Sequence, residues 1–200
     1  MVVMNKFRGE SLPLIGANQK FRGFTLIELV TVLIVIGILS ALAIPRFASV
    51  SSVNTRQFND QALALIRYGQ KIAIAQNTQV FVKLTSSSVA LCYNAGCGSP
   101  VAAVNNANSG TAATLAACGN STSWACEGAP AGVTISATDG SGNSYVGSSA
   151  LFYFSAQGKP YKTGESEPVS SISKPTTITI SGAAGNSVFT MEAETGYVHR

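Results

Sequence analysis

The first part of the chain contains one long apolar segment, Phe24–Ile44, with the sequence FTLIELVTVLIVIGILSALAI. Its single charged residue is Glu28. A helix over this range, at about 1.5 Å per residue, spans roughly 30 Å, which is the thickness of the hydrocarbon core of a bilayer. Basic residues precede the segment, so the pattern predicts a membrane helix whose N-terminal side stays in the cytoplasm and whose C-terminal side is exported.

A second helical pattern follows Pro45 and continues to about Gln76. Its apolar positions are separated by spacings typical of one helix face, and we expect this stripe to pack on a sheet. The stripe consists of Phe47, Val50, Phe58, Ala62, Leu65, Ile66, Gly69, Ile72 and Ala73. The opposite face carries Arg56, Asp60, Arg67 and Lys71, which predicts a solvated surface.

After Gln79 the apolar period changes to two, which is typical of strands. The stretches Val80–Leu84 and Val89–Tyr93, joined by a serine turn, predict a hairpin. We expect further strands at Val133–Ala137, Ala150–Phe154, Thr176–Ser181, Val188–Met191 and Tyr197–His199, and a loop from Ser99 to Ser123. A helix followed by an antiparallel sheet predicts an α+β fold.

The charge balance gives little reason to expect a nucleic-acid partner. The formal net charge is +4, but four of the 13 basic residues and one of the nine acidic residues precede residue 24. Nine basic residues against eight acidic ones remain beyond that point. The rest of the chain therefore lacks the strong positive field that binds polyanions.

The four cysteines are Cys92, Cys97, Cys118 and Cys126. They form no C-x-x-C pair, and the only histidine is His199, so we expect no metal site. Disulfides are the better interpretation, and they indicate export from the cytoplasm. Of the three possible connectivities, loop-closure entropy favours the two local pairs, 92 with 97 and 118 with 126. Trp124 is expected to anchor this loop to the domain.

No sequence pattern points to catalysis or to a cofactor. The chain has no G-x-S-x-G, H-E-x-x-H or P-loop motif. His199 is expected to lie at a strand end rather than to act as a base. The acidic pairs Glu165/Glu167 and Glu192/Glu194 are expected at exposed sheet rims rather than in a glycosidase site. We therefore predict a protein that is not an enzyme.

Glu28 separates the possible interpretations of the apolar segment. The alternatives are a secretory signal cut after Ala43, an unprocessed membrane anchor and a buried core helix. A carboxylate in an apolar helix costs about 2.5–3.5 kcal/mol at a membrane centre, and it therefore calls for a partner. Cleavage before Phe24 would place a new α-amine, with a pKa of about 7.7–8.0, four residues away. This argument favours cleavage between Gly23 and Phe24.

The sequence RGFTLIE at residues 22–28, the apolar run and Pro45 together resemble the class III prepilin signal of type IV pilins and type II secretion pseudopilins. The resemblance implies that a prepilin peptidase cuts between Gly23 and Phe24 and N-methylates Phe24. It also implies that Glu28 pairs with the N-terminus of a neighbouring subunit. Gly37 and Pro45 bound a stretch that is expected to loosen in a filament, and Pro45 is expected to kink or open the helix.

The same resemblance implies a domain organisation and a set of partners. Residues 1–23 would be the leader, 24–45 the membrane and filament-core helix, and 46–200 the rest of the helix with a β-sheet domain. The expected partners are other pilin subunits, the prepilin peptidase and an inner-membrane assembly platform. The protein would reside in the inner membrane before assembly and in an extracytoplasmic filament afterwards.

Two motifs in the second half resemble the GspH/FimT group of pseudopilins and minor pilins: Phe154–Gly158 and Glu194–His199. The hairpin that ends in Leu91–Tyr93 is similar to that of minor pilins from mannose-sensitive haemagglutinin (MSHA) pili. The expected function is a minor subunit that primes or decorates an adhesive filament. A type II secretion pseudopilin of the H type and a minor pilin that binds DNA or a glycan remain open. For DNA the candidates are Lys159, Lys162 and Lys174.

Overall fold

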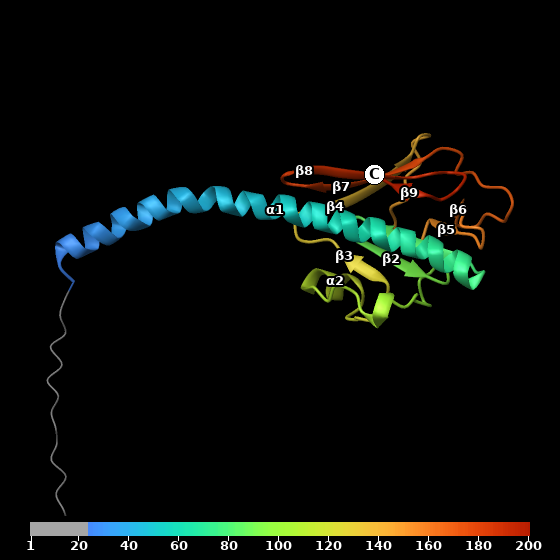
Figure 1. Cartoon of the computed structure of the whole chain (residues 1–200), viewed down its shortest axis with the longest axis horizontal. Coiled ribbons are helices and arrows are strands. Elements are labelled where there is room, and N and C mark those ends of the chain that lie inside the picture. The colour runs from blue at the N-terminus through green and yellow to red at the C-terminus, as the bar shows by residue number, and fades with distance from the viewer. Residues whose placement is uncertain (1–23) are drawn as a thin grey trace, which may run out of the picture. The chain divides into compact units, whose positions relative to one another are not determined.

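The computed structural model describes residues 24–200, and from 41 to 52 it describes the backbone only. It divides into two units, one that ends at Leu42 and one that runs from Ala43 to Arg200. Helix α1 (Leu26–Gln76) contributes to both (Figure 1). The predicted leader, including Gly23, lies outside the described residues, as do the side chains of Phe47 and Val50.

Helix α1 is assigned without a break through Gly37 and Pro45. The predicted end of the second helical pattern, Gln76, is the observed end of the helix. The local opening expected at Gly37 and Pro45 concerns an assembled filament and stays a prediction.

The second unit contains nine strands, all in antiparallel pairs, within the described part of the chain. One sheet has the order β3-β2-β1-β5-β6 and the other the order β4-β7-β8-β9. The strands are β1 (Val80–Thr85), β2 (Ser88–Cys92), β3 (Cys126–Gly128), β4 (Thr134–Asp139), β5 (Phe152–Phe154), β6 (Pro160–Lys162), β7 (Thr176–Gly182), β8 (Gly185–Met191) and β9 (Val198–His199).

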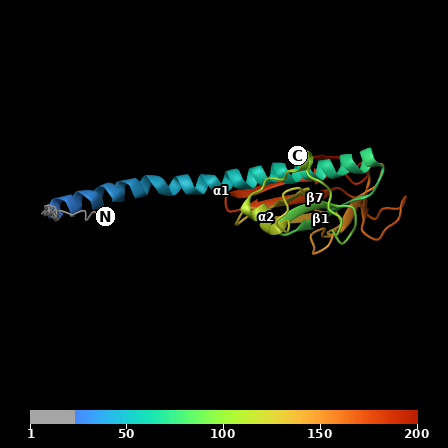
Figure 2. The same ribbon diagram turned by 90° about the horizontal axis from the view of Figure 1, so that it is seen from below.

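The α+β prediction is confirmed, but the expectation of a single sheet was wrong. The first sheet is built on the β1–β2 hairpin, in which Val82 faces Leu91 in register. The second is built on the β7–β8 hairpin, in which Ile178 faces Phe189. Strands β3, β5 and β6 extend the first sheet, and β4 and β9 extend the second. Both sheets lie on one side of the second half of α1 (Figure 2).

The predicted strands are present, with ends shifted by one to three residues. Strands β3 and β6 were not predicted, because each has three residues and, unlike β5, lies in no longer apolar run of the sequence. The predicted loop Ser99–Ser123 contains a 3₁₀ turn, η1 (Val104–Asn106), and a short helix, α2 (Ala112–Ala117). The side chain of Thr111 caps α2 by accepting a hydrogen bond from the Thr114 N–H.

The apolar stripe of α1 forms the centre of the core. Phe58 and Ile66 are completely buried, and they lie in one cluster with residues of both sheets. Gly69 allows a close approach of α1 to β2: a Cβ at this position would lie 2.8 Å from a methyl group of Leu91. Aromatic rings of β5 fill the interior, where Phe152 and Phe154 pack edge to face at 5.9 Å between centroids.

The predicted solvated face of α1 is confirmed for Arg56, Asp60 and Lys71, which are exposed. Asp60 pairs with Arg200 at the surface. Arg67 is the exception, because it is half-buried and donates a hydrogen bond from Nε to the Val198 carbonyl at 2.7 Å. The reason lies in β9, a two-residue edge strand whose exposed backbone groups need partners.

Candidate assembly site on the N-terminal helix

Helix α1 begins with a side-chain cap that the sequence analysis missed. The Glu28 N–H donates to Thr25 Oγ1 at 3.3 Å, and the Leu29 N–H donates to the Thr25 carbonyl at 3.2 Å. Threonine at the cap with glutamate three residues later is the sequence of a capping box, which could have been recognised from T-x-x-E alone. Thr25 therefore fixes where the helix starts.

The position of Glu28 in the capped first turn of α1 lowers the energetic cost of its charge. Its carboxylate is exposed in the first turn of α1 and has no hydrogen bond or ion pair among the described residues. A negative charge in the first helical turn is stabilised by the helix dipole, by about 0.3–1 kcal/mol. The helix end therefore offsets part of the cost of this charge, and the rest still requires a cation.

The side chains of residues 24–40 are exposed, including Phe24 at 78% and Leu26 at 83%. Besides Thr25, two hydroxyl groups in this range hydrogen bond to the helix itself. Thr31 Oγ1 donates to the Glu28 carbonyl at 2.9 Å, and Ser40 Oγ donates to the Ile36 carbonyl at 2.7 Å. Such internal bonds allow a hydroxyl to leave water, so the surface is suited to apolar surroundings.

Among the residues described, no helix meets the combined length and hydropathy needed to cross a bilayer. The last four residues of the predicted span, 41–44, belong to the range in which only the backbone is described.

Both predicted local disulfides are present. Cys92 pairs with Cys97 and Cys118 with Cys126, with Cα–Cα distances of 5.0 and 5.9 Å. Trp124 lies against the second disulfide and donates from Nε1 to the Leu91 carbonyl at 2.8 Å. It therefore anchors the cysteine-containing loop to β2, as predicted.

The two motifs of the second half meet at one residue of α1. Gln70 Nε2 donates to the Gly158 carbonyl at 3.0 Å and to the Thr195 carbonyl at 2.7 Å. An ion pair of 2.6 Å between Lys159 and Glu194 lies beside them. Gln70 thus ties a turn of the first sheet to a turn of the second, and no pattern in the sequence indicates this role.

The remaining candidates for chemistry are engaged in structural contacts. His199 Nε2 lies 2.9 Å from the Glu192 carboxylate, which, together with the Arg200 carbonyl, raises the pKa of His199. Glu165 accepts hydrogen bonds from the backbone N–H groups of Lys162 and Ser171. In the described ranges no group of three His, Cys, Asp or Glu residues could hold a metal ion.

Comparison with known protein families gives a match at the N-terminus. The family described as the prokaryotic N-terminal methylation motif matches residues 18–44. This chain carries the N-terminal methylation motif. The matched range includes four predicted site residues: Gly23, which is outside the described residues, Phe24, Glu28 and Gly37. Phe24 and Glu28 lie at the capped, exposed beginning of α1.

A curated relative contains a similar N-terminal region. The type IV narrow pilus major component PilA5 of Thermus thermophilus is 40% identical over 58 residues, which is 29% of this chain and 50% of the relative. The match thus spans half the length of that relative. Among solved structures, the type IV minor pilin FimU of Pseudomonas aeruginosa aligns with a TM-score of 0.40 at 12% identity, covering 76% of this chain and 87% of FimU.

Proposed function

We propose that this chain is a structural, non-enzymatic minor subunit of an MSHA-like type IV pilus. A prepilin peptidase cleaves it between Gly23 and Phe24 and methylates the new N-terminus. The subunit then passes from the inner membrane into an adhesive filament, which it primes or decorates. The observation that carries the proposal is the methylation motif at the start of a helix whose apolar side chains are exposed.

The exposed part of α1 supports assembly with other subunits. Large exposed apolar surfaces on proteins mark interaction sites. Stacking of such helices in a head-to-tail arrangement leaves the contact open at both ends, and open contacts generate fibres. Burial of the side chains from Leu26 onwards supplies the free energy, and Glu28 with the methylated amine of a neighbour sets the axial register.

One observation supports a pilus rather than a type II secretion system: the relative in Thermus thermophilus is a major component of a type IV pilus. The proposal of a minor subunit rests on the resemblance of Phe154–Gly158 and Glu194–His199 to the GspH/FimT group. The type II secretion pseudopilin of the H type is the second candidate.

Substitution of Glu28 tests the proposed register. Glu28→Val should leave membrane insertion and leader cleavage intact but reduce incorporation into filaments by about tenfold, because the charge pair is lost. Glu28→Gln is the matched variant: a capping box accepts glutamine, so this substitution removes the charge and keeps the cap. The measurement is the amount of the subunit in sheared filaments relative to the amount in the membrane. Normal incorporation of Glu28→Gln would contradict the charge-based register.

A further inference from the structure

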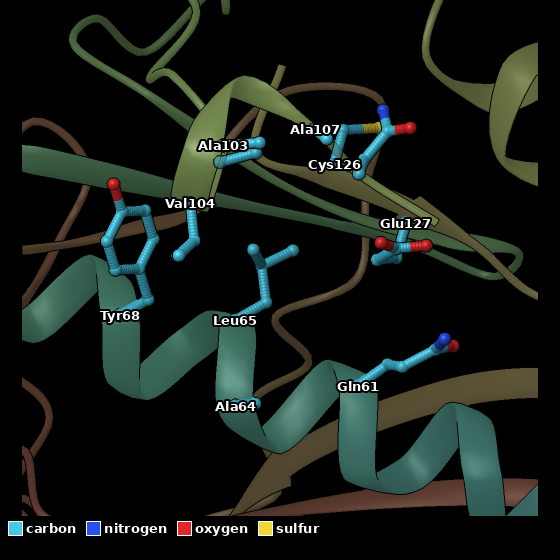
Figure 3. A pocket seen from close by; sticks show the side chains of 11 residues that line it. Gln61, Ala64, Leu65, Tyr68, Ala103, Val104, Ala107, Cys126 and Glu127 are labelled. Carbon is cyan, nitrogen blue, oxygen red and sulfur yellow. The ribbon is translucent and has the colours of Figure 1, made fainter. Parts of the chain in front are cut away.

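A groove of about 210 Å³ lies between α1 and the segment Val101–Asn108 (Figure 3). Leu65 and Tyr68 of α1 form one wall, and Ala103 and Val104 form the other. Glu127, the middle residue of β3, lies at one end of the groove. The walls are mostly apolar, and among the described residues that line the groove Glu127 alone carries a charge.

The carboxylate of Glu127 is held by neutral donors alone. The residue is 9% exposed. Its oxygens accept hydrogen bonds from the Ser109 N–H at 2.8 Å, from Ser109 Oγ and from Thr114 Oγ1 at 2.9 Å. No cation forms an ion pair with it in the described part of the chain. A carboxylate offers about four acceptor positions, so one remains, and a buried charge without a counter-ion is costly.

The surrounding contacts keep the groove open and rigid. Tyr68 donates its hydroxyl to the Ala102 carbonyl at 3.1 Å, which ties α1 to the opposite wall. Asn108 Nδ2 donates to the Ser121 and Trp124 carbonyls at 2.8 and 3.2 Å, which holds the end of that wall. These contacts lie within the protein itself and hold both walls in place, so binding requires little rearrangement.

We propose that this groove receives a lysine side chain of a neighbouring pilus subunit, with the ammonium on Glu127 and the aliphatic stem between Leu65 and Val104. Lysine combines an apolar stem with a terminal cation, which matches apolar walls that end at a carboxylate. Sites for small molecules typically measure about 300–1,000 Å³, so this smaller groove is suited to a single side chain. The inference rests on the proposed pilus function.

The chemistry of the groove is tested with n-pentylammonium, and n-pentanol serves as the uncharged probe. With the purified full-length protein in detergent, NMR titration should show n-pentylammonium binding about tenfold more tightly than n-pentanol, because a hydrogen bond to a charged group contributes more than a neutral one. Glu127→Gln should remove this preference. Equal binding of both probes to the wild type, or an unchanged preference in Glu127→Gln, would overturn the proposal.

A second variant tests the groove without changing the hydrogen bonds of Glu127. Ala107 lines the groove and is exposed, so Ala107→Phe should fill the groove and abolish binding of both probes. Ala116→Phe on α2 is the matched control, since Ala116 is exposed and does not line the groove. Binding that survives Ala107→Phe would place the ligand elsewhere and contradict the proposal.

The source of the lysine is tested in assembled filaments. A photo-crosslinking residue at position 107 should attach to a peptide next to a lysine of another subunit, and the same residue at position 116 should not. If cleaved, filament-incorporated protein gives no such crosslink, the lysine partner is wrong and the pilus function stands. If the protein is neither cleaved nor incorporated, the proposed function itself fails.

Discussion

At the residue scale, two glycines, Gly158 and Gly196, meet where a turn of the first sheet contacts a turn of the second. Gly196 has a φ of +64°, and a Cβ there would lie 2.2 Å from the Gly158 carbonyl oxygen. Both glycines belong to motifs recognised in the sequence, but the contact between them follows only from the fold. The motifs were thus visible in the sequence, whereas their meeting at Gln70 was not.

Gly196→Ala should lower the free energy of unfolding by about 1–3 kcal/mol, because it adds overpacking to an unfavourable backbone conformation. Gly110 has a similar φ of +62° and no atom near its would-be Cβ, so Gly110→Ala measures the backbone cost alone. Urea unfolding of both variants checks the difference. Equal losses would show that the contact between the glycines carries no cost.

Asp139 holds the turn after β4 through a buried carboxylate that is 6% exposed. Burial alone would raise the pKa of Asp139, but hydrogen bonds from Asn143, Ser141 and Tyr145 overcome this effect and lower it to about 2. Burial and the neighbouring Asp139 in turn raise the pKa of Tyr145. The charged form of Asp139 is therefore the one that the fold stabilises.

Because the folded-state pKa of Asp139 is below its ordinary value of 3.8, its contribution is present above pH 4 and is lost as the pH falls towards 2. Asp139→Asn should cost about 2 kcal/mol at pH 6, and the difference from the wild type should shrink between pH 4 and pH 2. The free energy of chemical unfolding, measured for both proteins at pH 4 and at pH 2, checks this difference. A difference that stays constant with pH would contradict the assignment.

At the element scale, long periodic segments were predictable and short ones were not. The α1 stripe and the β1–β2 hairpin follow from their apolar spacing alone. Strand β3 and helix α2 depend on each other instead: a Cβ at Gly128 would lie 2.3 Å from the Ala113 carbonyl oxygen, and the Gly128 N–H donates to Thr114 Oγ1. Such mutual dependence leaves no local signal in the sequence. The role of Glu127 could not be predicted from the sequence for the same reason.

The disulfide between Cys118 and Cys126 joins the end of α2 to the start of β3. Replacing both cysteines by serine should lower the free energy of unfolding by about 2–3 kcal/mol, mainly through a less constrained unfolded chain. Unfolding of the double variant and the wild type, both with the 92–97 pair intact, gives the difference. Unchanged stability would show that the hydrogen bonds around Thr114 suffice to hold α2 on β3.

At the scale of the whole molecule, three of the edge strands accept or donate a hydrogen bond outside their sheet. Thr114 accepts from the Gly128 N–H of β3, Ser170 Oγ donates to the Pro160 carbonyl of β6, and Arg67 donates to the Val198 carbonyl of β9. Such contacts oppose pairing of these strands with other chains. The exposed apolar part of α1 is the surface that the proposed filament would use.

The mass of the intact exported protein, with fragmentation of its N-terminus, tests the account most directly. We expect a chain that begins at Phe24, carries one added methyl group on its amine and lacks two hydrogens for each of the two disulfides. A chain that begins at residue 1 or at Ile44 would contradict the proposed processing, and with it the pairing of Glu28 and the assignment to a pilus.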